Sequence, residues 1–298
     1  MKIKKRISKQ TRETLTAWAL LSPTLFFLLL FTVIPIFRSI YLSFHHLDLS
    51  VREPVFIGFE NFQRLYRSRL FWRVMNNTLQ FTLMTVIPSM AIGLGLAMLV
   101  NNKRRGVGFF RTSFFYPVVM PMIAVSSIWM FIFMARNGLL DQTLVRMGIP
   151  TIGILNNRST AMPALAGMYT WKEAGYLMIF FLSGLQNLDT ELFEAAKIDG
   201  ASRFTAFRCI TLPLLMPTTL FVSIIALTNS VKLVDHIVMM TEGAPNNATT
   251  TLLYYIYQYG FAFFDQWMAS TLTAILLVIM LSISLLQFLR VDKKIYYN

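Results

Sequence analysis

The chain has 298 residues, of which 55% are hydrophobic and only 14% are charged. A soluble domain of this length does not bury so much apolar surface, so the composition argues against a soluble enzyme and against disordered or collagen-like chains. The net charge of +13 would by itself fit a partner such as nucleic acid. A single cysteine, Cys209, excludes an internal disulfide and a Cys-based zinc cluster. With three histidines in the chain, we expect neither a resident metal nor a redox cofactor.

Six apolar runs are long enough to cross a bilayer as helices, because about 20 apolar residues span a hydrocarbon core roughly 30 Å thick. The runs are Leu15–Phe37, Thr78–Val100, Thr112–Met134, Met162–Leu185, Ile210–Val231 and Ala269–Leu289. Only the fourth contains charged residues, Lys172 and Glu173. The first follows a basic leader but lacks an A-x-A cleavage site, so we expect an uncleaved span. The predicted fold class is an all-α integral membrane protein with six transmembrane helices.

The distribution of Lys and Arg predicts the orientation in the membrane. With six spans, both tails and the segments 101–111 and 186–209 share one side, which carries 16 of these residues against 9 on the other. We therefore expect both termini in the cytoplasm. The first outer segment departs from this rule, because four arginines gather there: Arg64, Arg67, Arg69 and Arg73. Since the basic residues flank spans, they act as topology signals, and we expect no nucleic-acid partner.

The segments outside the predicted spans are shorter than about 40 residues, so none is large enough to fold as a separate soluble domain. In the first outer segment, apolar residues recur at helical spacing: Phe59, Phe62, Leu65 and Tyr66. This pattern favours an interfacial anchor helix over a docking surface. The last outer segment contains an aromatic-rich run at 251–264, which favours an interfacial belt over a lining for the mouth of a pathway.

The segment between the fourth and fifth spans is too regularly patterned for a simple tether. Its apolar positions recur at helical spacing: Leu188, Leu192, Ala195 and Ala196. Asp189 is placed to cap the start of a helix, and Gly200 follows where that helix would end. We therefore expect a helix, a glycine turn and a second helix that leads into the fifth span. Composition alone favours an ordinary amphipathic surface helix over a knob that inserts into a partner.

The run EAAKIDGASRFTAFRCITLP resembles the cytoplasmic signature of the membrane subunits of binding-protein-dependent ABC importers. That signature is E-A-A, three residues, G, nine residues and I-x-L-P, and every spacing is kept at Glu194, Ala195, Ala196, Gly200, Ile210, Leu212 and Pro213. The flanks at 57–62, 171–188 and 243–257 resemble the carbohydrate-uptake branch. Within it, the chain is similar to permease subunits of glycerol-3-phosphate-type and maltose-type importers. The resemblance extends from the first span to the sixth.

This resemblance implies a type I ABC importer permease fold in the bacterial cytoplasmic membrane. The helix around Glu194, Asp199 and Gly200 would be the coupling helix, which docks on a cytoplasmic ATPase. The chain has no G-x-x-x-x-G-K-[ST] loop. ATP and Mg²⁺ would therefore be bound by the separate ATPase, and this chain would be no enzyme and hold no catalytic residue. The implied partners are two ATPase copies, a second, non-identical permease, an extracytoplasmic solute-binding protein and membrane lipid.

The expected organisation has four parts. Residues 1–14 form a cytoplasmic tail, 15–72 hold the first span and the outer interfacial segment, 73–289 form the permease core, and 290–298 form a second cytoplasmic tail. The expected solute is a sugar, an oligosaccharide, or a polyol- or glycerophosphate-type compound. Two alternatives stay open at this point. One is an ABC permease for another solute, such as an amino acid or a metal, and the other is a stand-alone secondary transporter or channel.

Several polar residues are candidates for the solute pathway. Lys172 and Glu173 lie inside a predicted span, where ionisable groups are costly and usually functional. Adjacent helical residues point about 100° apart, so each needs its own partner. Lys172 and Glu173 could each line the solute cavity or pair with another span. For Trp171, packing against other side chains is favoured over stacking on a sugar ring. Residues near the outer end of the fifth span are either pathway groups or an interfacial cap: Asn229, Lys232 and Asp235.

Overall fold

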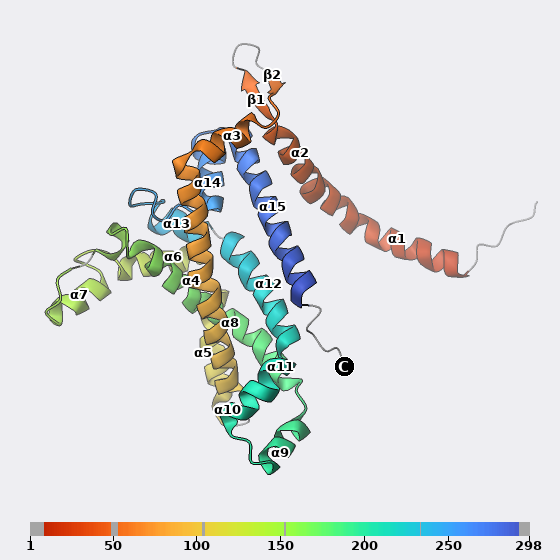
Figure 1. The fold of residues 1–298 in the computed structure, drawn as a ribbon, viewed down its shortest axis with the longest axis vertical. Coiled ribbons are helices and arrows are strands. Elements are labelled where there is room, and N and C mark those ends of the chain that lie inside the picture. The colour runs from red at the N-terminus through yellow and green to blue at the C-terminus, as the bar shows by residue number, and fades with distance from the viewer. Residues whose placement is uncertain (1–8, 49–52, 103–104, 152, 233, 292–298) are drawn as a thin grey trace, which may run out of the picture.

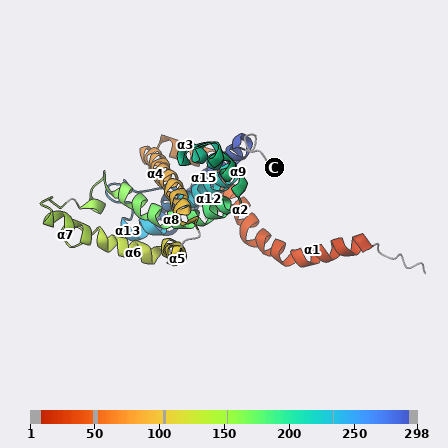
Figure 2. The same cartoon turned by 90° about the horizontal axis from the view of Figure 1, so that it is seen from below.

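The first span leaves the bundle at its N-terminal half. The computed structural model describes residues 9–48, 53–102, 105–151, 153–232 and 234–291, so parts of both expected tails, 1–8 and 292–298, lie outside the described residues. The span consists of α1 (Lys9–Leu28), a π-helical turn (Leu29–Val33) and α2 (Ile34–Ser43). Pro35, which lacks a backbone N–H, follows the widened turn. Helix α1 projects away from the other helices (Figures 1 and 2), whereas α2 packs against α15 (Gln266–Val291), and the most apolar stretch of the span has no buried residue.

A small β-hairpin follows the first span, so the expectation of an all-α chain is wrong here. Strand β1 (His45–Asp48) pairs antiparallel with β2 (Glu53–Phe56). Asn61, which is only 1% exposed, holds the base of the hairpin, because its Nδ2 donates to the carbonyls of Ser43 (3.2 Å) and His45 (3.0 Å). The strands have four residues each. They are therefore too short to show a clear alternation of apolar and polar residues.

The expected interfacial helix is α3 (Glu60–Arg67), and it lies beside the hairpin at one end of the molecule (Figure 1). Its apolar residues do not form one buried stripe. Leu65 is 2% exposed and packs into a core with α4, α14 and α15, whereas Tyr66 and the preceding Phe59 are 69% and 66% exposed. The exposed aromatic side chains fit contact with an interface, while Leu65 holds the helix to the bundle.

The centre of the bundle is the pairing of α4 (Arg69–Val100) with α8 (Ala161–Gln186). These helices match the second and fourth predicted spans. The 32 residues of α4 extend about 48 Å at about 1.5 Å per residue, so α4 starts well before the expected span. Gly93 allows the close approach, because a Cβ there would lie 3.1 Å from the Ala174 carbonyl oxygen and from Leu177 Cβ.

The third predicted span is not one straight helix, and the expectation of a continuous Thr112–Met134 helix is wrong. Instead, α5 (Val107–Val119) and α6 (Met122–Ile132) meet at 97°. Pro121 lies at the break, and the residue before a proline is biased away from the helical region. Met120 accordingly has φ −72° and ψ 136°. Two short helices follow α6 in the next segment: α7 (Leu139–Arg146) and a 3₁₀ turn (Ile154–Asn156).

The fifth predicted span is also bent, so a straight Ile210–Val231 helix is wrong as well. The chain passes through α9 (Thr190–Ile198), α10 (Arg203–Ala206), a π-helical turn (Phe207–Thr211), α11 (Leu212–Leu214) and α12 (Met216–Lys232). A 69° bend separates the segment that ends with α11 from α12. Pro213 and Pro217 flank it, and each removes a donor from the helical ladder.

The chain closes with three helices, of which the first packs against α6, the second against α4 and α15, and the third against α2. They are α13 (Asp235–Met240), α14 (Leu252–Tyr257), which continues into a π-helical turn (Gln258–Ala262), and α15 (Gln266–Val291). Figure 1 shows the hairpin, α3 and α14 at one end of the long axis and α9 and α10 at the other. The predicted topology assigns the first of these ends to the outside and the second to the cytoplasm.

The number of spans is confirmed only in part. Among the described residues, three helices are long and apolar enough to cross a membrane, or five when each bent pair is one span. The predicted fourth span coincides with α8, whose 26 residues suffice to cross but include Lys172 and Glu173. The count of six therefore stays a prediction.

Replacement of Gly175 by Ala tests the contact between α8 and α5. A Cβ at Gly175 would overlap the carbonyl oxygen of Phe114, and backbone cannot yield as a flexible side chain can. We expect Gly175→Ala to lower the free energy of unfolding by about 1–3 kcal/mol, as measured by denaturation in mixed detergent micelles. Gly167 on the same helix has no such neighbour within 4 Å. Gly167→Ala should therefore raise stability by about 0.5–1 kcal/mol. Equal effects of the two changes would contradict the packing.

Candidate functional site

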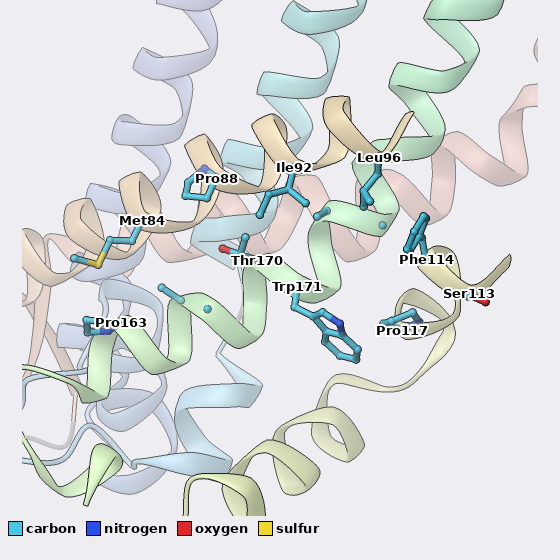
Figure 3. Close-up of a pocket in the computed structure, with 14 residues that line it drawn as sticks. Met84, Pro88, Ile92, Leu96, Ser113, Phe114, Pro117, Pro163, Thr170 and Trp171 are labelled. Atoms are coloured by element: carbon cyan, nitrogen blue, oxygen red, sulfur yellow. The ribbon is translucent and has the colours of Figure 1, made fainter. Parts of the chain in front are cut away.

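A cavity of about 800 Å³ lies between α4, α5 and α8. Its wall is mainly apolar and includes Met84, Ile92, Phe114 and Trp171. Figure 3 shows the indole of Trp171 extending from α8 on the side where Phe114 and Pro117 lie. Small residues spaced eight apart on α8 open the space: Ala166 with Ala174, and Gly167 with Gly175. That spacing places each pair on one helix face, and it is the signal that sequence reasoning missed.

Lys172 forms hydrogen bonds with the backbone at the break between α5 and α6. Its Nζ donates to the carbonyl oxygens of Pro117 (2.7 Å), Val118 (3.0 Å) and Met120 (2.7 Å). The last carbonyls of a helix have no partner within that helix, and an ammonium group offers three donors. One side chain thus satisfies three backbone groups at a bend inside the bundle.

Glu173 forms its hydrogen bond with α12, whereas Lys172 contacts α5 and the break. Its side chain is 8% exposed, and its Oε1 accepts a hydrogen bond of 2.9 Å from Asn229 Nδ2. This contact joins α8 to α12. The expectation that Lys172 and Glu173 each have their own partner is confirmed, and the structure brings two of the pathway candidates, Glu173 and Asn229, together.

The other pathway candidates are not part of this pair. Trp171 is 45% exposed and packs edge-on against Trp129 at a centroid distance of 5.7 Å. Lys232 is exposed and Asp235 half-buried, and neither forms a salt bridge within the described part of the chain. The neighbouring His236 is fully buried and stacks on Phe81 at 5.1 Å. Its burial lowers the pKa of the imidazole to about 3, so His236 is a neutral packing residue at neutral pH.

The patterned segment after α8 forms the expected capped helix and glycine turn. Asp189 Oδ1 accepts a hydrogen bond from Glu191 N (2.9 Å) and caps α9. At the other end, Gly200 has φ +77°, a conformation that favours glycine. Ala201 N donates to Ala196 O (2.9 Å) and Gly200 N to Lys197 O (3.2 Å). This pair of bonds is a Schellman motif.

The surface of α9 and α10 is almost entirely free of contacts with the rest of the chain. The described part of α9 has no buried residue, and Glu194 and Ala195 are exposed while Ala196 is half-buried. Three large apolar side chains form what we call the α9–α10 patch: Leu192 (45% exposed), Ile198 (86%) and Phe204 (71%). Sequence reasoning missed Ile198 and Phe204, because they lie outside the helical repeat that singled out Leu192. The signature residues Ile210, Leu212 and Pro213 lie at the entry to α12.

Comparison with known proteins identifies the family. The model for the binding-protein-dependent transport system inner membrane component matches residues 89–295. The chain belongs to this family. Members are inner membrane components of transport systems, and the curated relatives are named as permease proteins of such systems rather than as enzymes. The resemblance inferred from the signature is therefore confirmed.

Relatives and solved structures cover nearly the whole chain. The lactose transport system permease protein LacF of Rhizobium radiobacter is 33% identical over 95% of this chain and 96% of its own. The sulfoquinovosyl glycerol transport system permease protein SmoG of Agrobacterium fabrum is 33% identical over 91% of this chain and 89% of its own. A bacterial ABC transporter involved in alginate import has a TM-score of 0.83 at 23% identity, covering 96% of this chain and 98% of that chain. This likeness shows the type I importer permease fold.

Removal of the Lys172 ammonium tests its role at the helix break. Lys172→Met keeps the length of the side chain but leaves three partly buried carbonyls without their donor. We expect the free energy of unfolding to fall by about 2–4 kcal/mol, as measured in mixed micelles. Lys232→Met, on an exposed lysine, should change it by less than about 0.5 kcal/mol. A Lys172→Met protein of unchanged stability would contradict the capping role.

Proposed function

We propose that this chain is the membrane-spanning permease subunit of an ATP-driven importer for a sugar, an oligosaccharide, or a polyol- or glycerophosphate-type solute. The observation that carries the proposal is the similarity over nearly the full length to permeases named for lactose and sulfoquinovosyl glycerol transport. A third relative, named for sn-glycerol-3-phosphate transport, is 30% identical over 94% of this chain. The cavity of about 800 Å³ is large enough for such solutes. We assign Trp171 to its wall.

The proposed assembly has two permeases, two ATPases and an extracytoplasmic solute-binding protein. Its supports are the family description, which specifies dependence on a binding protein, and the single copy of the coupling signature in this chain. A similar bacterial alginate transporter has been solved in complex with a periplasmic protein that carries alginate pentasaccharide. In this proposal, ATP and Mg²⁺ bind to the ATPase, both termini lie in the cytoplasm, and residues 73–289 are the permease core.

The proposed coupling runs from α9 to the cavity wall through packed elements. The α9–α10 patch and the signature residues Glu194, Ala195 and Gly200 would dock in a cleft of the ATPase. From α10, the chain leads through the bent entry into α12. Asn229 on α12 binds Glu173 on α8, and α8 forms part of the cavity wall. Movement of α9 when the ATPase closes would therefore reach the cavity through α12 and α8, which alternating access requires.

A direct test is to identify what this chain binds in its native membrane. The chain is tagged, extracted in mild detergent, and the co-purifying proteins are identified by mass. We expect an ATPase and a second multi-span permease in stoichiometric amounts. A chain that is isolated alone and still transports solute in vesicles would instead support a stand-alone secondary transporter.

Substitution of Ile198 tests the docking surface without disturbing the fold. Its side chain is 86% exposed, so a charge there should leave α9 intact while opposing an apolar contact with the ATPase. We expect Ile198→Asp to reduce the amount of co-purified ATPase at least about tenfold. The control is Met147→Asp, because Met147 is 71% exposed but lies at the end of α7. Equal ATPase recovery with both variants would argue against docking through this patch.

A further inference from the structure

A second cavity, of about 260 Å³, lies at the predicted outer end of α4 and α8. Unlike the larger cavity, its wall is polar. Two arginines, Arg73 on α4 and Arg158 just before α8, line it together with Asn76, Gln80 and Ser159. Arg73 is half-buried and Arg158 is exposed. No Asp or Glu occurs among the described residues that form this wall. The cavity therefore presents positive charge and neutral hydrogen-bonding groups.

The two positive charges in this wall lack a partner of opposite sign. Arg73 Nη1 donates to the carbonyl oxygen of Asn246 (3.2 Å), which positions the side chain but does not neutralise it. Neither Arg73 nor Arg158 forms a salt bridge with a carboxylate in the described ranges. Two positively charged side chains that line one cavity attract an anion to it, and guanidinium groups bind carboxylate and phosphate groups through paired hydrogen bonds.

The wall beside Arg73 is held in place by buried contacts. Asn77, which is 7% exposed, donates from Nδ2 to the carbonyls of Asn247 (2.8 Å) and Thr250 (3.0 Å). Thr78 Oγ1 accepts a hydrogen bond of 2.8 Å from Leu252 N. These bonds fix the turn after α13 against α4, one helical turn from Arg73. The α4 side of the cavity is thus held in place by the fold itself.

The polar cavity leads to the larger one. Met84 of α4 and Pro163 of α8 line both cavities. A solute that moves along the groove between α4 and α8 would therefore meet the arginines first and the apolar cavity next. Arg73 belongs to the arginine cluster that departs from the charge rule for outer segments.

We propose that the polar cavity is an entry site for an anionic solute, in which Arg73 and Arg158 bind a carboxylate, sulfonate or phosphate group of a sugar. Asn76, Gln80 and Ser159 would bind its hydroxyl groups. The inference rests on the proposed function, because it assumes that this chain imports a sugar-type solute. The anion site narrows the proposed solutes to acidic sugars. A neutral sugar would leave both arginines without a counter-charge.

The test compares sugars that carry an acidic group with neutral counterparts. Cells that express the intact importer with its binding protein receive radiolabelled glucuronate, glucose 6-phosphate, sulfoquinovose or digalacturonate, and glucose or galactobiose as neutral counterparts. We expect ATP-dependent uptake of at least one anionic sugar in preference to its counterpart. Arg73→Gln and Arg158→Gln should each raise its half-saturating concentration about tenfold. Arg146→Gln, on an exposed arginine of α7 outside the cavity, should leave it unchanged.

The outcomes separate this inference from the proposed function. Arg158→Gln is the decisive variant, because the structure gives the Arg158 side chain no hydrogen bond or salt bridge with the described residues whose loss could unfold the chain. Uptake confined to neutral sugars, or absent for every sugar while the ATPase still co-purifies, overturns the anion site. An equal loss of anionic and neutral uptake in both variants also overturns it, in favour of a contact with the binding protein. Failure of the ATPase to co-purify would instead reject the importer.

Discussion

Backbone groups inside a bilayer must find partners within the protein, because no water reaches them. This constraint governs the α5–α6 break, where a 97° bend leaves carbonyls that no helical N–H can meet. The Lys172 ammonium donates hydrogen bonds to three of these carbonyls. This group stabilises the turn that Pro121 introduces beside the larger cavity. The shape of that cavity depends on the bend, since Phe114 and Pro117 on α5 form part of its wall.

Helix α8 connects the parts of the molecule on which the proposed function depends. It contacts α4 along most of its length, α5 through Gly175 and Lys172, and α12 through Glu173. Near its end, a Cβ at Gly184 would approach Thr218 Oγ1 to 2.6 Å, so α12 lies close there as well. Since one helix carries the cavity wall and these three contacts, its position cannot change without moving its neighbours.

Much of the fold was predictable, because composition and hydrophobic length depend on local sequence. The first, second and sixth spans, the cap at Asp189 and the turn at Gly200 follow from such signals. The bends at Pro121 and near Pro213 were not predicted, because an apolar run looks the same whether it is straight or broken. The hairpin depends on Asn61, whose partners are 16 and 18 residues away. The cavities combine residues from distant helices, so sequence spacing revealed only Trp171 in the larger one.

The Schellman motif at Gly200 has a further consequence for the proposed docking element. The motif and the Asp189 cap stabilise the two ends of α9 from within the chain, and the helix is formed in the structure without a partner. A segment that folds only upon contact loses conformational entropy at that moment and binds more weakly for its area. Because α9 is already folded, its contact with the ATPase would separate and form again in each transport cycle while the helix keeps one conformation.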